Sequence, residues 1–150
     1  MLEAGLAIYR TTVPWAERKI LQHDGPAPSW LCNLAMTTYR PKIIETVRAF
    51  AYSEPFEAIT FSEEHYRVAC LFLRFERREI SWATFLNESG LYTDAVSGEV
   101  HCEEFYAMLN ALEQSEYNEA LEAEQANTVR EQFGPHIAEV RADYRRLLKP

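Results

Sequence analysis

The chain has 150 residues, of which 47% are apolar, and a formal net charge of −8. A chain of this length is the size of one ordinary domain and buries roughly 70% of its unfolded surface. Its apolar fraction excludes a disordered protein. The acidic balance argues against direct binding to nucleic acid or to an anionic membrane.

The first 55 residues predict three helices separated by turns. Thr12 and Pro14 are typical of a helix start, so we expect the first helix over residues 12–22. A second segment is expected over residues 30–38, and a third begins at Pro41. The apolar residues of the third segment recur at helical spacing: Ile43, Ile44, Val47 and Phe50.

The most apolar helix is predicted around Tyr66–Phe75. Thr60 and Glu63 have the spacing of a capping box at its start. A strand is the alternative for so short an apolar run, but the spacing of Arg67 and Arg74 on one narrow polar stripe favours a helix. Because its other sides are apolar, we expect this helix in the middle of a bundle.

Two less regular segments follow this helix. Ser81–Glu88 predicts a short helix, which Ser89 and Gly90 are expected to end. Leu91–Gly98 shows no clear period, and we expect a loop or a small hairpin there.

The last third of the chain predicts two long helical stretches. The first begins at His101 and ends at Phe133, and Ser115 either caps a second segment or lies inside a continuous helix. The second follows the turn at Gly134 and Pro135. Its apolar face consists of Ile137, Val140, Tyr144, Leu147 and Leu148. Its opposite, basic face consists of Arg141, Arg145, Arg146 and Lys149. Because the turn is short, we expect the two stretches to pack antiparallel.

Together these elements predict an all-α fold, a multi-helix bundle in a single domain over residues 1–150. The three cysteines are far apart and odd in number, which favours a reduced, intracellular protein over a disulfide framework. The first ten residues lack the cationic start of a signal peptide, and the longest apolar run, Val68–Leu73, is too short to span a bilayer. We therefore expect a cytoplasmic protein with no membrane partner.

The negative charge is concentrated in one segment. Residues 79–129 contain 11 carboxylates and no lysine or arginine, whereas the rest of the chain carries 15 cations and 12 anions. This segment is the acidic block. Eight of its carboxylates are candidate partner-binding residues: Glu99, Glu103, Glu104, Glu113, Glu116, Glu119, Glu122 and Glu124.

Four of these carboxylates recur at every third position from Glu113 to Glu122, which would spread them across the surface of one helix. A solvated helix usually mixes lysine with glutamate, and like charges this close destabilise a free helix. One interpretation is a solvent-facing surface that keeps the protein soluble. The alternative is a binding surface for a cationic partner.

The charge pattern leads to a hypothesis about function. We expect a non-enzymatic binding protein that presents an acidic helical surface to a basic site on a partner protein, and a nucleic-acid-binding site is one candidate for it. Rows of carboxylates can occupy such a site in place of phosphates. A phage-borne antagonist of a nucleic-acid-handling machine, or an immunity protein that covers a basic toxin site, fits this description. The sequence leaves open whether the basic final helix neutralises part of the block.

Two alternatives belong to other classes. A small α-helical metal protein or enzyme would use His65, His101, Cys102 and Glu104, because His101 and Glu104 can face one metal on a helix. No HExxH, ExxH, phosphate-loop or nucleophile-elbow motif occurs, however, and acidic neighbours disfavour a Cys102 thiolate. We therefore predict no catalytic residue, no metal and no cofactor. The other alternative is a structural subunit that forms a homodimer through exposed aromatic residues.

Overall fold

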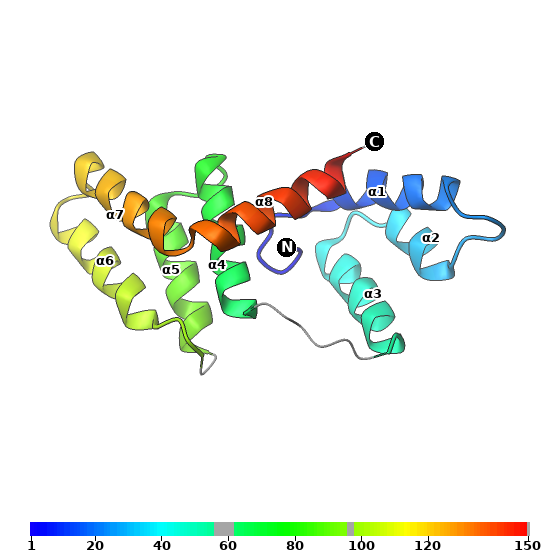
Figure 1. Cartoon of the computed structure of the whole chain (residues 1–150), viewed down its shortest axis with the longest axis horizontal. Coiled ribbons are helices and arrows are strands. Elements are labelled where there is room, and N and C mark those ends of the chain that lie inside the picture. Colours follow the sequence, from blue (N-terminus) through cyan, green and yellow to red (C-terminus); the bar gives the residue numbers. More distant parts are fainter. Residues whose placement is uncertain (56–61, 96–97, 150) are drawn as a thin grey trace. The chain divides into compact units, whose positions relative to one another are not determined.

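Helices are the regular elements of the part of the chain that the structure describes. The computed structural model describes residues 1–55, 62–95 and 98–149. Within these ranges it has eight helices and no strand, which confirms the predicted all-α fold (Figure 1). The helices are α1 (Tyr9–Leu21), α2 (Ser29–Ala35), α3 (Arg40–Ser53), α4 (Glu63–Glu76), α5 (Trp82–Asp94), α6 (Cys102–Gln114), α7 (Glu119–Gln132) and α8 (Gly134–Leu148).

Backbone contacts divide the chain into two compact units. The first unit contains Met1–Thr60 and Ala142–Pro150, and the second contains Phe61–Arg141. The boundary therefore falls inside α8. Each unit has a core of its own. The expectation of one domain over residues 1–150 stays a prediction.

In the first unit, α1 packs against α2, and α2 packs against α3. The buried residues of this small core are Ala16, Leu31, Leu34 and Ile43. Half-buried aromatic rings extend it: the Trp30 ring stacks on Phe50 with centroids 4.0 Å apart and lies 6.3 Å from the Trp15 ring.

Helix α1 begins three residues before Thr12, which the sequence suggested as its cap. The backbone N–H of Ile8 donates to Thr11 Oγ1 at 3.0 Å, and the hydroxyls of Thr11 and Thr12 both donate to the Ile8 carbonyl oxygen. Thr12 is therefore inside the helix instead of capping it.

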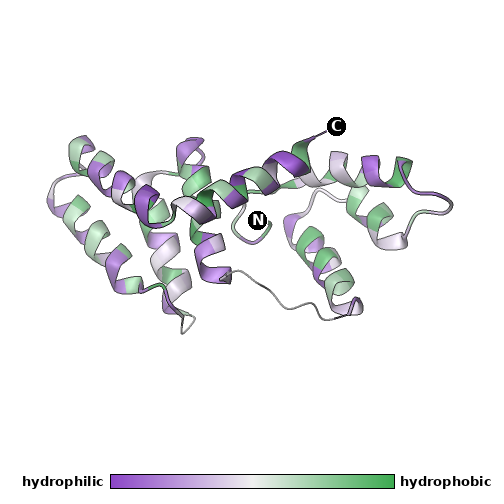
Figure 2. Ribbon diagram, viewed as in Figure 1, coloured by the Kyte–Doolittle hydropathy of each residue, from purple (hydrophilic) through white to green (hydrophobic). Residues whose placement is uncertain are grey.

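In the second unit, α5 lies between α4 and α6 (Figure 1). Helix α4 buries six consecutive residues, Val68–Leu73, as expected for a helix that is apolar on most sides. The aromatic rings of Phe72, Trp82, Phe85 and Phe105 pack in sequence across the three helices, with the Trp82 and Phe85 rings stacked at 4.6 Å. Figure 2 shows hydrophobic and hydrophilic residues alternating along each helix, which is typical of amphipathic elements.

The start of α4 is capped by Ser62. The Ser62 hydroxyl oxygen accepts from the backbone N–H of His65 at 3.5 Å, close to the limit for a hydrogen bond. Thr60, the cap expected from the sequence, lies outside the described residues.

The predicted end of α5 is wrong. The helix continues through Ser89 and Gly90 to Asp94, so residues 91–94 are helical instead of forming a loop or hairpin; residues 96 and 97 lie outside the described ranges. A Cβ atom on Gly90 would lie 2.7 Å from Cε1 of Tyr106 on α6. Glycine therefore serves here to let two helices approach closely and does not end the helix.

The acidic stretch after His101 is two helices and not one. Helix α6 ends at Gln114, and Glu116 and Tyr117 then adopt left-handed backbone angles, with φ of 55° and 60°. Asn118, rather than Ser115, caps α7: its Oδ1 accepts from the backbone N–H groups of Ala120 and Leu121 at 2.9 and 3.2 Å.

The predicted antiparallel packing of the last two helices is also wrong. Among the described residues, α7 and α8 do not pack along each other's lengths. Gly134 does not adopt the positive φ that commonly ends a helix, and α8 begins at that residue directly after Phe133. As a separate matter, none of the described helices combines the length and apolarity needed to cross a membrane.

Candidate functional site

Charge is divided between the two units. The first unit has nine lysines and arginines and seven carboxylates, a net charge of +2. The second has six cations and sixteen carboxylates, a net charge of −10. The second unit therefore carries all of the net negative charge of the protein.

The eight candidate carboxylates follow the backbone from the start of α6 into α7. Glu99 precedes α6, and the others lie at the two ends of α6, in the α6–α7 turn and in the first half of α7. The expectation that the four glutamates from Glu113 to Glu122 share one helix is wrong. Glu113 lies in the last turn of α6, Glu116 in the connecting turn, and Glu119 and Glu122 in the first turn of α7.

Helix electrostatics explain part of this distribution. Glu103 and Glu104 lie in the first turn of α6, and Glu119 and Glu122 in the first turn of α7. A carboxylate near a helix N-terminus is stabilised by the helix dipole. Glu113 lies near a helix C-terminus, where a negative charge is disfavoured. Local helix stability therefore accounts for four of the eight carboxylates, but not for the whole block.

Two cations, Arg74 at the end of α4 and Arg77 directly after it, neutralise only the first part of the acidic block. Arg74 lies 3.6 Å from both Glu79 and Glu88, and Arg77 lies 2.7 Å from Glu79. Arg130 and Arg141 instead contact Glu76, which precedes the block. The basic face of the final helix therefore contributes no ion pair to the block among the described residues.

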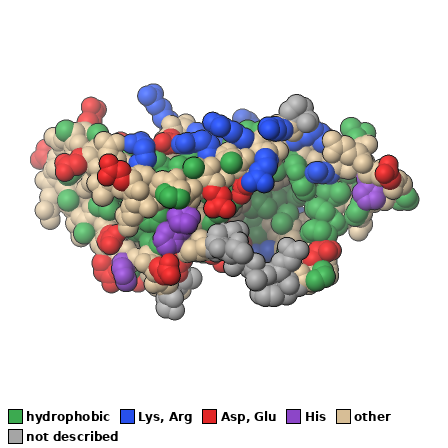
Figure 3. All heavy atoms as spheres, in the orientation of Figure 1, with side chains coloured by type: hydrophobic (Ala, Val, Ile, Leu, Met, Phe, Trp, Pro, Cys, Tyr) green, Lys and Arg blue, Asp and Glu red, His purple; other side chains and the backbone are tan. Residues whose placement is uncertain are grey.

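The eight candidate carboxylates have no such partner. Within residues 1–55, 62–95 and 98–149, none of them forms an ion pair with a lysine, an arginine or a histidine. Seven are exposed and Glu122 is half-buried. Around the α6–α7 turn, at the left end of the view in Figure 3, carboxylates are visible without any Lys or Arg side chain among them.

An exposed tyrosine lies at the tip of this surface. Tyr117, between Glu116 and Glu119, is 57% exposed and has a positive φ. A left-handed conformation is uncommon for a residue with a bulky side chain. Tyrosine is also enriched among the residues that contribute most to binding at protein interfaces. Tyr117 was not a candidate from the sequence, because both readings of the stretch after His101 kept this residue helical.

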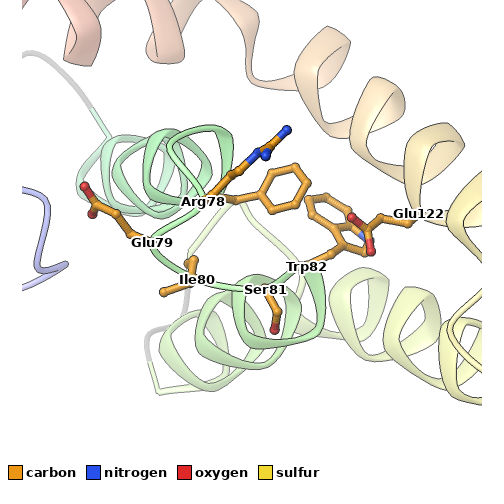
Figure 4. Close-up of a pocket in the computed structure, with 7 residues that line it drawn as sticks. Arg78, Glu79, Ile80, Ser81, Trp82 and Glu122 are labelled. Atoms are coloured by element: carbon orange, nitrogen blue, oxygen red, sulfur yellow. The ribbon is translucent and has the colours of Figure 1, made fainter.

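A groove beside the block connects it to the α4–α5 turn. Its volume is about 380 Å³, and its lining residues are Phe75, Arg78, Glu79, Ile80, Ser81, Trp82 and Glu122. In Figure 4, Glu122 extends from α7 toward the Trp82 side chain. Arg78 lines the same groove but forms no ion pair with Glu122 among the described contacts. The sequence did not indicate this groove, because it joins residues about 40 positions apart along the chain.

The residues of the metal-protein alternative make separate contacts. His65 Nδ1 lies 2.8 Å from Ser62 Oγ, and the His65 ring lies 4.7 Å from the His136 ring. His101 is exposed at the N-cap of α6. The described residues contain no group of three or more His, Cys, Asp or Glu side chains placed to hold a metal ion.

Cys102 is surrounded by acidic groups. Its Sγ lies 3.6 Å from Asp94 Oδ1 and 3.5 Å from Glu103 Oε2. Burial raises the pKa of the Cys102 thiol, and the hydrogen bond to Glu103 and the nearby negative charges raise it further. Hydrogen bonds from its own backbone N–H and from Cys102 lower the pKa of Glu103. This environment favours a protonated thiol, which is a poor nucleophile.

The chain matches no family model, no curated protein and no solved structure. The metal-protein and homodimer alternatives stay predictions.

Proposed function

We propose that this chain is a non-enzymatic binding protein whose acidic block docks on a basic surface of a partner protein. The observation that carries this proposal is the set of eight carboxylates without an ion pair among the described residues. An ordinary solvated surface intersperses both signs of charge. Here 51 consecutive residues supply no lysine or arginine at all.

The chemistry of the surface indicates the kind of partner. Clustered carboxylates attract a surface rich in lysine and arginine, and surfaces that bind nucleic-acid phosphates are of this kind. A protein that covers this surface would compete with nucleic acid. The roles that fit are an antagonist of a nucleic-acid-handling machine, such as a phage-borne inhibitor, or an immunity protein against a basic toxin.

Two features would add specificity to the charge. Tyr117 offers a large exposed side chain at the centre of the α6–α7 turn, and the groove beside Glu122 and Trp82 can take a lysine or arginine side chain of the partner. Exposed charges mainly accelerate association, whereas anchors of this kind slow dissociation.

The test is capture of the partner by matched charge variants. The block variant carries Glu113→Gln, Glu116→Gln, Glu119→Gln and Glu124→Gln. The control carries Glu17→Gln, Glu54→Gln, Glu131→Gln and Glu139→Gln, which are exposed glutamates outside the block without an ion pair among the described contacts. Both variants lose four negative charges, and glutamine keeps the shape and helix propensity of glutamate.

Each protein is immobilised and exposed to a nuclease-treated lysate of its native host. We expect the unmodified chain and the control to retain the same basic protein, and the block variant to lose it, with helical circular dichroism unchanged in all three. The amount of partner protein that the unmodified chain retains should also fall as ionic strength rises, because salt screens exposed charges. Equal capture by both variants, or equal loss from both, contradicts the proposal.

A further inference from the structure

The first unit contains a small pocket surrounded by cations. Its volume is about 170 Å³, and its lining residues are Trp15, Arg18, Lys19, Gln22, Arg146 and Lys149. The first four come from the C-terminal half of α1 and the residue after it, and the last two come from the end of α8 and the residue after it, all within the first unit. Four of the six lining residues are cations, and none is acidic.

The two arginines of the pocket already have partners. Arg18 Nη2 donates to the Leu147 carbonyl oxygen at 2.8 Å, so it satisfies an acceptor at the C-terminal end of α8. Arg146 forms an ion pair with Asp143, one turn earlier on the same helix. Cations in the last turns of α1 and α8 also suit the dipoles of those helices.

The dipole of α1 suits Lys19, but it supplies no anionic partner for either lysine of the pocket. Lys19 and Lys149 form no ion pair among the described contacts, although both line the same pocket. Like charges gathered around one concave site repel each other in the free protein. An anion bound between them would relieve this repulsion.

We propose that this pocket binds the phosphate group of a soluble small molecule. A phosphate monoester carries a charge of about −1.5 to −2 at pH 7, which matches the two unpaired lysines better than a single carboxylate does. Arginine and lysine are the side chains that usually bind phosphate oxygens. Trp15 supplies a flat apolar wall for the carbon skeleton attached to the phosphate.

The size of the pocket limits the ligand. Sites for drug-sized ligands have volumes of about 300–1,000 Å³, so a pocket of about 170 Å³ accommodates a phosphate group and a few further atoms. Nucleic acid is disfavoured, because it requires an extended positive surface and the net charge of this unit is only +2. This site uses none of the carboxylates of the proposed partner surface, so the two proposals stand independently.

The chain offers a control lysine outside the pocket for the test. It has three lysines, and the third, Lys42, lies on α3 and forms an ion pair with Glu45 at 3.0 Å, outside the pocket. The experiment measures binding of pyrophosphate and inorganic phosphate to the full chain by isothermal titration calorimetry at constant ionic strength. The proteins compared are the unmodified chain, the double variant Lys19→Ala/Lys149→Ala, and Lys42→Ala.

We expect saturable binding of pyrophosphate by the unmodified chain and by Lys42→Ala, and a loss of affinity of about tenfold or more in the double variant. Absence of saturable binding overturns the proposal, as does equal weakening in Lys42→Ala, which would show that net charge alone attracts the ion. A third arm titrates a single-stranded oligonucleotide. Tighter binding of the oligonucleotide through the same two lysines would also overturn the proposal, because it would assign the pocket to a nucleic-acid surface.

Discussion

Helix α7 carries three of the candidate carboxylates but buries only three of its residues, Gln125, Ala126 and Val129. Its position depends on a polar connection in the core. The Trp82 Nε1–H donates to Gln125 Oε1 at 2.8 Å, and Gln125 Nε2 donates to the Met108 carbonyl oxygen at 3.0 Å. One amide side chain thereby connects α7 to both α5 and α6.

This connection can be measured with a double-mutant cycle. Gln125→Leu leaves the buried Trp82 N–H and the Met108 carbonyl without their partner, which should cost about 1–3 kcal/mol. Trp82→Phe leaves Gln125 Oε1 unsatisfied at a similar cost, and the smaller ring adds a cavity term on the order of 1 kcal/mol. The double variant lacks both the indole N–H at position 82 and the amide at position 125, so neither position leaves the other with an unpaired polar group.

The two substitutions should therefore be less harmful together than their sum, by about 1–2 kcal/mol. Urea denaturation followed by far-ultraviolet circular dichroism gives the free energy of unfolding of each variant, and it does not depend on tryptophan emission. A coupling energy below about 0.5 kcal/mol would mean that the two side chains do not interact, and it would refute the account of how α7 is held.

Two further predictions concern the ends of the acidic helices. Asn118→Ala removes the acceptor for two N–H groups at the start of α7 and should lower the free energy of unfolding by about 0.5–2 kcal/mol. Asn118→Asp keeps an acceptor and should not lower it. Equal urea midpoints for the two variants would contradict the capping role. Because burial and Glu103 raise the pKa of Cys102, its stabilising contribution is complete below the unfolded thiol pKa and declines as pH rises through the folded value. At about pH 8.5, iodoacetamide should modify Cys102 more slowly than a free model thiol, and Glu103→Gln should speed the reaction. Peptide mass spectrometry measures both rates, and an unchanged rate in Glu103→Gln would remove the proposed influence of that carboxylate.

Two helix ends differ from what the local sequence predicts. Gly90 has the local features of a helix end, and only the approach of the Tyr106 ring shows why a glycine is needed inside α5. Glu116 and Tyr117 have no glycine-like signal either, yet both adopt left-handed angles between α6 and α7, where their backbone N–H groups donate to the carbonyl oxygens of Glu113 and Leu112. Local propensity is a weak guide to where a helix ends.

The sequence by itself determined the all-α class and the separation of charge, because helical periodicity and formal charge are properties of neighbouring residues. Only the tertiary structure decided which carboxylates are paired. Arg74 reaches Glu88, whereas no described cation reaches the glutamates of α6 and α7. It also brought Lys19 and Lys149, 130 positions apart, to one pocket. Such groupings depend on where the helices cross, and that is set by the packing of buried side chains from distant parts of the chain.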